Sequence, residues 1–234
     1  NRLITFVIRI RLNSILKIKY SPFLIKYTLK TVFFILVLFS LSCDNSSKTD
    51  KQILAIDVGL NIERFDKLFA SSNPTELPSL KQKYPFLFSS RFSDSTWINR
   101  MKDPIQSLLN NAVDSVFNDF RQTESEINLF YQHLKYYNKS ISIPRVITVL
   151  SDVDYRNKVI VTDTIVLIAL DTYLGKDHEF YTSFYEYKKQ NLNPTQIVPD
   201  LASSYAEQFI HQPKKTTFLD QMIYFGKQLY LKDL

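Results

Sequence analysis

Glycine is scarce in this chain of 234 residues, which holds only Gly59, Gly175 and Gly226. Phosphate-binding loops of the Rossmann and P-loop kinds need closely spaced glycines, because the backbone itself must approach the anion. The three glycines lie far apart, so no such loop can be built from them. We therefore expect no nucleotide ligand and no cofactor.

Histidine is equally rare, with His133, His178 and His211 the only examples. The pair His178-Glu179 begins like the zinc-protease motif, which needs a second histidine four residues after the first so that both rings face one ion. Thr182 occupies that position. The pattern predicts no catalytic metal.

Cysteine occurs once, at Cys43, so an internal disulfide is excluded. A run of about ten apolar residues, Val32 to Leu41, precedes it, with Lys26 and Lys30 before the run and the polar stretch DNSSK after the cysteine. This arrangement is typical of a secretory signal, and a membrane-spanning helix would need roughly twenty apolar residues. A cysteine at the cleavage position indicates a bacterial lipoprotein signal, in which Cys43 becomes the first residue and carries acyl chains such as palmitate. The alternative is a free, buried cysteine at the end of an uncleaved anchor.

These features predict three parts of the chain. Residues 1–42 form the targeting segment, residues 43–52 a polar tether, and residues 53–234 a single domain. The signal itself needs only about residues 22–42. Because residue one is asparagine and the first twenty residues contain no acid, we expect the upstream part to lie outside the working protein.

Basic residues are not in excess in the predicted mature chain. Seven of the 29 lysines and arginines lie in residues 1–42, which hold no acid, so 22 basic residues remain against 23 acidic ones. The net charge of +6 therefore belongs to the targeting segment. Without a basic surface to follow a phosphate backbone, we expect no nucleic-acid partner.

The apolar periodicity predicts an α+β fold, with a small mixed β-sheet covered by amphipathic helices. We expect strands within 53–65, 145–150, 158–161 and 164–170, the last being a central strand buried on both faces. Helices are expected at 77–84, 104–120, from Thr123 onward with a capping box to Glu126, at 195–210 and at 217–231. The helices at 104–120 and from 123 should pack as a hairpin, and those at 104–120 and 195–210 should cover the central strand.

Two polar loops adjoin the predicted strands. The loop SDVDYRNK at 151–158 lies between the strands expected at 145–150 and 158–161, and the segment DTYLGKDHEFY at 171–181 follows the central strand. Their charged and titratable side chains form a candidate interaction site, which consists of Asp152, Asp154, Arg156, Asp171, Asp177 and His178. Loops of this kind also pair their own charges and cap their own backbone. A different class of function remains open, a periplasmic hydrolase of metallopeptidase type whose non-standard site uses Asp152, Asp154 and His178.

Several longer stretches resemble one known family. The segments SDVDYRNKVI, LIALDTYLGKDHEFY, QIVPDLASSYAEQFI and FLDQMIYFGKQLYLKDL, together with IERFD and WINRMKDP, are similar to the gliding-motility lipoprotein family GldB of the Bacteroidetes. The resemblance implies a non-enzymatic envelope lipoprotein, required for gliding over surfaces and linked to type IX secretion. It implies a lipid-anchored, periplasm-facing location, with the inner or outer membrane unresolved, and other gliding or secretion envelope proteins as partners. Family members usually continue past LYLKDL, so we expect a missing C-terminal portion.

The same family is faintly similar to predicted zinc-dependent proteases. On that alignment Pro199 and Ser203 replace the two metal histidines, Asp200 replaces the glutamate, and Phe225 lies near the later acid. The resemblance therefore implies a degenerate zincin-like scaffold without its metal.

Overall fold

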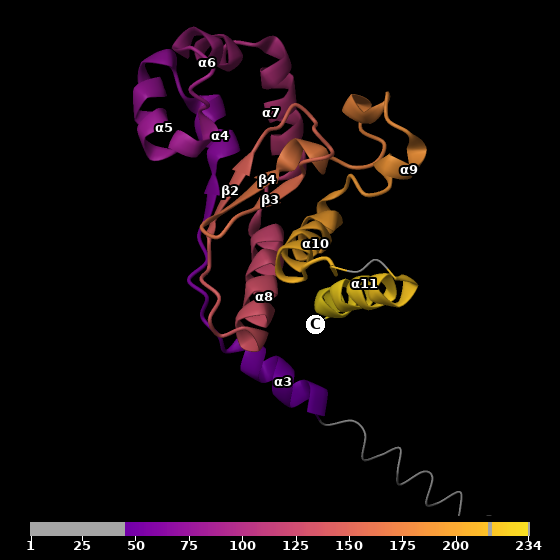
Figure 1. The fold of residues 1–234 in the computed structure, drawn as a ribbon. Helices are drawn as coiled ribbons and strands as arrows, with labels where there is room; N and C mark the ends of the chain where they lie inside the picture. Colours follow the sequence, from indigo (N-terminus) through magenta and orange to yellow (C-terminus); the bar gives the residue numbers. More distant parts are fainter. Residues whose placement is uncertain (1–44, 215–216, 234) are drawn as a thin grey trace, which may run out of the picture. The chain divides into compact units, whose positions relative to one another are not determined.

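The computed structural model describes residues 45–214 and 217–233 (Figure 1). The chain divides into two units, Asn1–Gln52 and Ile53–Leu234. The predicted targeting segment and Cys43 lie outside the described residues. Among the described helices, none combines the length and the apolar character that crossing a membrane requires.

The segment before the sheet is more helical than predicted. Helix α3 (Asn45–Leu54) spans most of the expected tether, and only Ile62–Arg64 of the expected strand at 53–65 forms strand β1. A local turn interrupts the extended chain, because Gly59 N–H donates to the Asp57 carboxylate at 2.9 Å and Gly59 has a φ of 58°.

The sheet is mixed, as predicted. Its strands are β1, β2 (Arg145–Val149), β3 (Val159–Val161) and β4 (Ile165–Ala169), in the order β1-β2-β4-β3. Strands β1, β2 and β4 run parallel, and β3 is antiparallel to β4. The β-branched runs at 145–149 and 165–169 therefore form the two interior strands, and together with the helices they confirm the α+β class.

Both faces of the sheet are covered. On one face Val146, Val166 and Ile168 pack in a cluster with residues of α7 (Pro104–Val116), α8 (Arg121–Tyr137) and α10 (Ile197–Phe209). On the other face Ile147 packs against α4 (Phe65–Ser71) and α5 (Leu77–Lys83), with α6 (Asp94–Met101) behind them. The central strand is thus covered on both sides as predicted, although Ile165 and Leu167 on the second face are only partly buried, and its covers are not those expected.

The predicted pair of covering helices lies on one face only. Val113 of α7 and Leu201 of α10 belong to the same cluster. The second face is covered by α4 and α5 because β1 pairs beside β2 and leads directly into α4. The prediction of one cover from each helix was therefore wrong.

Helix α7 begins where the sequence predicts. The Asp103 carboxylate accepts the Ile105 N–H at 2.9 Å, and Pro104 occupies the first position. The helix ends at Val116, because Phe117 turns into the core and is 1% exposed. The next helix starts at Arg121, so Thr123 lies inside it and the predicted capping box is absent.

The expected hairpin of these two helices is also wrong. Helix α7 packs against α4, whereas α8 packs against α10, and the two follow one another along the sheet (Figure 1). Arg64 fixes the link between the two helices. Its guanidinium lies 4.5 Å from the centre of the Phe120 ring and donates to the Phe117 carbonyl at 3.4 Å.

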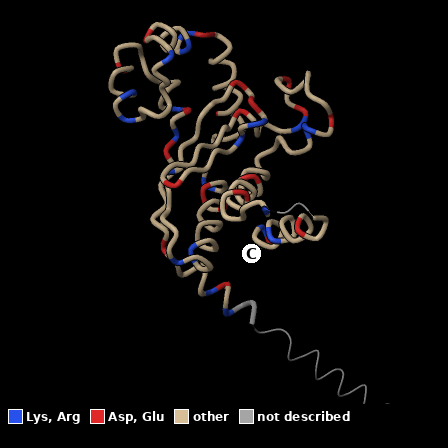
Figure 2. The backbone as a smooth tube through the Cα atoms, viewed as in Figure 1, with Lys and Arg blue, Asp and Glu red and all other residues tan. Residues whose placement is uncertain are grey.

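The remaining elements are short, apart from the last helix. Helix α11 (Phe218–Asp233) packs on α10 and exposes apolar side chains such as Phe218 and Leu229. The short elements are η1 (Pro74–Glu76), η2 (Pro85–Leu87), η3 (Leu170–Thr172), η4 (Glu179–Tyr181), α9 (Glu186–Lys189) and η5 (Pro194–Gln196). Figure 2 shows basic and acidic residues interspersed along the described backbone.

The core position of β4 generates a stability prediction. Ile168 is 0% exposed, so Ile168→Asp should lower the free energy of unfolding by several kcal/mol, because a buried unpaired carboxylate is strongly disfavoured. Urea denaturation followed by circular dichroism measures the loss, and immunoblotting should show depletion from the envelope. The matched control is Ile160→Asp on β3, where the side chain is 42% exposed and the cost should stay below about 1 kcal/mol. Equal stability of the two variants would contradict the central position of β4.

Candidate functional site

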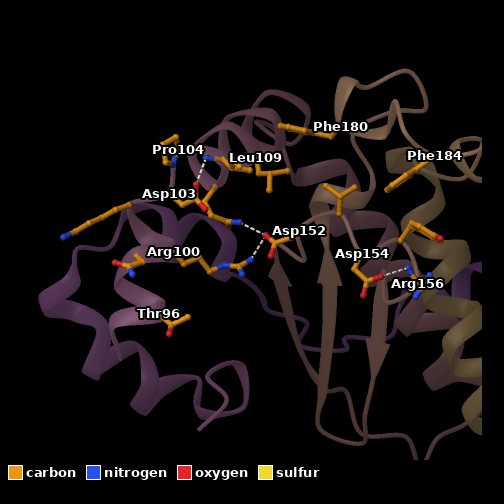
Figure 3. Close-up of a pocket in the computed structure, with 16 residues that line it drawn as sticks. Thr96, Arg100, Asp103, Pro104, Leu109, Asp152, Asp154, Arg156, Phe180 and Phe184 are labelled. Carbon is orange, nitrogen blue, oxygen red and sulfur yellow. Dashed lines mark hydrogen bonds and ion pairs between the residues drawn. The ribbon is translucent and has the colours of Figure 1, made fainter. Parts of the chain in front are cut away.

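The candidate site lies where the parallel strands β2 and β4 end. Val149 and Ala169, their last residues, are paired in the sheet, so the two polar loops leave it side by side. In open sheets with parallel strands, ligands bind characteristically outside the carboxyl ends. The structure places an open cleft of about 1030 Å³ at this edge (Figure 3).

Asp171 lies beneath the cleft and organises the first loop. Its carboxylate is 0% exposed and accepts the Ser151 N–H at 3.0 Å, the Val153 N–H at 2.7 Å and the Ser151 hydroxyl at 3.3 Å. Burial raises the pKa of Asp171, and the backbone donors act in the opposite direction. The buried Tyr181 supports the following turn, donating to the Asp171 carbonyl at 2.8 Å and accepting the Leu174 N–H at 2.9 Å.

The loop backbone is strained where Asp171 holds it. Asp152 and Val153 have φ values of 58° and 62°, in the left-handed region that a β-branched residue rarely adopts. Such strain costs about 1–3 kcal/mol per residue and persists only when the surroundings impose it. The hydrogen bond from Val153 N–H to Asp171 imposes it here and directs the Asp152 side chain outward to the cleft.

Asp152 joins the loop to the opposite wall. Its carboxylate accepts a hydrogen bond from Arg100 at 2.6 Å and another from Gln106, which come from α6 and α7 (Figure 3). These partners are 52 and 46 positions away in the chain. Sequence analysis missed them, although Arg100 lies within the WINRMKDP segment that carries part of the family resemblance.

Asp154 holds its own turn. It accepts the Asn157 amide at 2.7 Å and the Arg156 N–H at 3.1 Å, and the Asn157 hydrogen bond is the main reason that the pKa of Asp154 is lowered. The Arg156 side chain is exposed and lines the cleft. Asp154 is therefore a turn-stabilising carboxylate at the mouth of the cleft.

Aromatic side chains form the far wall. Tyr155 packs edge-to-face on Phe184 at 4.9 Å, and Phe180 lines the same hollow. Lys188 of α9 donates to the Tyr155 hydroxyl at 2.6 Å and lies 4.1 Å from its ring centre, which lowers the pKa of Tyr155. The cleft thus combines charged rims with an apolar wall.

His178 and Asp177 lie outside the cleft lining. His178 accepts the Phe180 N–H at Nδ1, 3.3 Å away, and stacks on the Phe180 ring at 5.0 Å, so it begins η4 as a cap. Asp177 is exposed on the preceding turn. The structure therefore brings together Asp152, Asp154 and Arg156 at the cleft but does not add His178 to them. Within the described residues, no group of three or more metal-ligating side chains could hold an ion.

The residues expected at a degenerate metal helix lie on α10, away from the cleft lining. Asp200 forms an ion pair with Lys158 and accepts the Tyr173 hydroxyl at 2.8 Å. The Ser203 hydroxyl donates to the Pro199 carbonyl at 2.8 Å. Asp200 therefore ties α10 to the residues beside β3 and β4, whereas Ser203 bonds within its own helix.

Comparison with protein-family models matches residues 46–234 to the family described as gliding motility protein GldB. The chain belongs to this family. The GldB family is a lipoprotein family of gliding motility, which gives the protein a place in the cell envelope at the level of the family. Comparison with curated proteins and with solved structures gave no match.

The Asp171 network generates the second prediction. Asp171→Asn should lower the free energy of unfolding by about 2–4 kcal/mol, because an amide offers one acceptor where the carboxylate serves three donors, and its NH₂ group opposes them. Asp154→Asn is the matched control, and its partly exposed turn should lose less than about 1 kcal/mol. Urea denaturation at neutral pH compares the two. If both substitutions cost the same, Asp171 does not govern the loop.

Proposed function

We propose that this GldB-family protein is a lipid-anchored, non-enzymatic component of the gliding apparatus that binds another envelope protein through the cleft beside β2 and β4. The single observation that carries the proposal is that two carboxylates lining the cleft are engaged in hydrogen bonds within the protein. Asp152 is bound by Arg100 and Gln106, and Asp154 holds a turn, so both carboxylates support structure. A hydrolytic site would need such groups directed together at a substrate.

The cleft offers binding groups of a definite kind. Lys102 and Arg156 are exposed and line it, and within the described part of the chain neither forms an ion pair. Ile105, which is 61% exposed, and the rings of Phe180 and Phe184 supply apolar surface between them. Cations beside exposed apolar groups suit an acidic protein segment that carries large apolar residues.

The membrane attachment follows from Cys43, which the sequence places directly after the apolar run. Each buried methylene of an acyl chain contributes about 0.8 kcal/mol, and two chains give a stable anchor. An anchored domain would present the cleft to the periplasm.

Acylation at Cys43 is tested by Cys43→Ser. In a gliding bacterium that produces only the variant, metabolic labelling with an alkyne fatty acid should no longer mark the protein, because the thiol that receives the lipid is gone. The unchanged chain supplies the control. Labelling of the serine variant at the normal level would show that the lipid is absent or attached elsewhere.

The cleft is tested by reversing its unpaired charges. The double variant Lys102→Glu, Arg156→Glu should accumulate normally, since both side chains are exposed and surface changes cost about 0.5 kcal/mol or less. Tracking of single cells should nevertheless show gliding reduced by about tenfold or more, because an acidic partner would be repelled. Lys139→Glu, at an exposed turn after α8, is the control and should glide normally. Normal gliding of the double variant would remove the cleft from the proposed function.

A further inference from the structure

Asp171 is a buried titratable group beneath the cleft, and the proposed function gives it no part in binding the partner. Its side chain comes from η3, the turn that follows β4. Its hydrogen-bond donors from Ser151 and Val153 belong to the loop that follows β2. The carboxylate therefore fastens one cleft loop to the end of the neighbouring strand, and a change in its charge acts directly on that loop.

The fastened loop holds a shape that its residues do not favour. Asp152 and Val153 have φ values of 58° and 62°, and neither is a glycine. Backbone strain of this kind persists only while the surroundings impose it. Loss of the hydrogen bonds to Asp171 would let the turn relax. The Asp152 carboxylate would then leave Arg100 and Gln106, its two partners on the opposite wall of the cleft.

Two effects oppose each other at the Asp171 carboxylate. Burial raises the pKa of Asp171 above that of an exposed aspartate, whereas the hydrogen bonds from Val153 and Ser151 lower it. Because these donors belong to the loop, the fastened loop favours the ionised carboxylate, and ionisation in turn favours the fastened loop. A protonated carboxyl group has fewer acceptor sites and carries an O–H of its own, so it serves the same donors poorly.

We infer that Asp171 is a pH-operated latch of the cleft. The ionised side chain holds the loop 151–154 in place and keeps Asp152 paired with Arg100. The protonated side chain frees the loop, and the cleft loses the shape that binds the partner. The inference rests on the proposed function, because it supplies the regulation of that binding site. Acidification should therefore release the partner, and a return to neutral pH should restore the site.

The elements packed around Asp171 carry other titratable groups. Tyr181 of η4 donates its hydroxyl to the Asp171 carbonyl, and burial raises its pKa, so it stays protonated. Helix α7 packs on η3, and its Asp114 is exposed and ion-paired. Strand β2 carries Arg145 at the end away from the loop, and the Asp66 carboxylate bound to β2 already forms an ion pair.

Two further groups lie on the cleft loops themselves. Asp154 follows the strained turn, and the hydrogen bond from Asn157 is the main reason that its pKa is lowered, so it should take up a proton at lower pH than Asp171. His178 precedes η4, and its ring centre lies 5.9 Å from that of Tyr181. Because histidine side chains commonly titrate in the mildly acidic range, His178 needs its own control.

Both ends of the latch can be followed in one titration. Full-length protein in detergent micelles, labelled with ¹³C-aspartate and ¹⁵N-valine, is taken from about pH 7.5 to about pH 4.5 and back. The Asp171 carboxyl carbon should titrate with a midpoint above that of the exposed aspartates. The Val153 N–H signal should move upfield with the same midpoint, because its hydrogen bond to the carboxylate is lost.

A matched pair of variants tests the contribution of backbone strain. Val153→Gly and Val153→Ala both remove the apolar packing of the valine, but only glycine adopts a φ of 62° without strain. A less strained loop stays fastened to lower pH. The midpoint of the Asp171 carbon should therefore lie lower in Val153→Gly than in Val153→Ala, by about half a pH unit or more.

The neighbouring groups are tested by Asp154→Asn and His178→Asn. Asparagine can still accept the N–H that His178 caps, so η4 should keep its start. Each variant should retain the shared midpoint of the Asp171 carbon and the Val153 N–H. A transition that disappears in either variant would assign the switch to that side chain and overturn the latch.

Three other results would also overturn it. They are an Asp171 carbon that does not titrate before the domain unfolds, a Val153 N–H that stays in place while Asp171 titrates, and equal midpoints in Val153→Gly and Val153→Ala. The test is separable from that of the proposed function. A working latch combined with normal gliding of Lys102→Glu, Arg156→Glu would keep the latch and remove the cleft function. Loss of gliding in that variant without the titration would do the reverse.

Discussion

The hydrogen bonds between Asp171 and the loop after β2 are the constraint on which the candidate site depends. Val149 pairs with Ala169 in parallel register, so the residues two positions further on, Ser151 and Asp171, leave the sheet together. The carboxylate therefore meets the N–H groups of Ser151 and Val153 with little displacement. That contact sets the left-handed turn, and the turn presents Asp152 to Arg100. The cleft is thus a consequence of strand register.

The wall of the cleft opposite this loop is built by α6 and α7, which pack in the apolar clusters on opposite faces of the sheet. Trp97 and Met101 of α6 pack with the cluster on one face, whereas Val113 of α7 belongs to the cluster on the other. The connection between these helices carries Lys102 and Asp103, so it is fixed from both sides of the sheet. A wall held in this way can present charged side chains without a long mobile loop.

Much of the scaffold was predictable, because it rests on local pattern. The runs of β-branched residues predicted the interior strands, and Asp103-Pro104 predicted the start of α7. The covers of the sheet were not predictable, since amphipathic periodicity shows that a helix has an apolar face but not which layer that face joins. The end of α7 was missed because Phe117 continues the helical spacing although its ring enters the core.

The site was predictable only in part. The sequence brought Asp152, Asp154 and Arg156 together because they share one loop. It could not show that Asp171 is buried beneath them, because a carboxylate just after an apolar strand is usually exposed. The contact of Arg100 with Asp152 spans 52 positions, and the strained turn contains no glycine that would mark it. Long-range pairing and backbone strain are properties of the assembled fold.

The lengths of the edge strands bear on how the domain behaves when many copies share a surface. Strands β1 and β3 bound the sheet, and each has only three residues. Glu63 and Arg64 lie on the first edge, and α10 packs against the second. Short, charged or covered edges give a neighbouring copy little backbone to pair with. Crowded copies of the domain would therefore resist joining their sheets into larger assemblies, and the cleft of each copy would stay open.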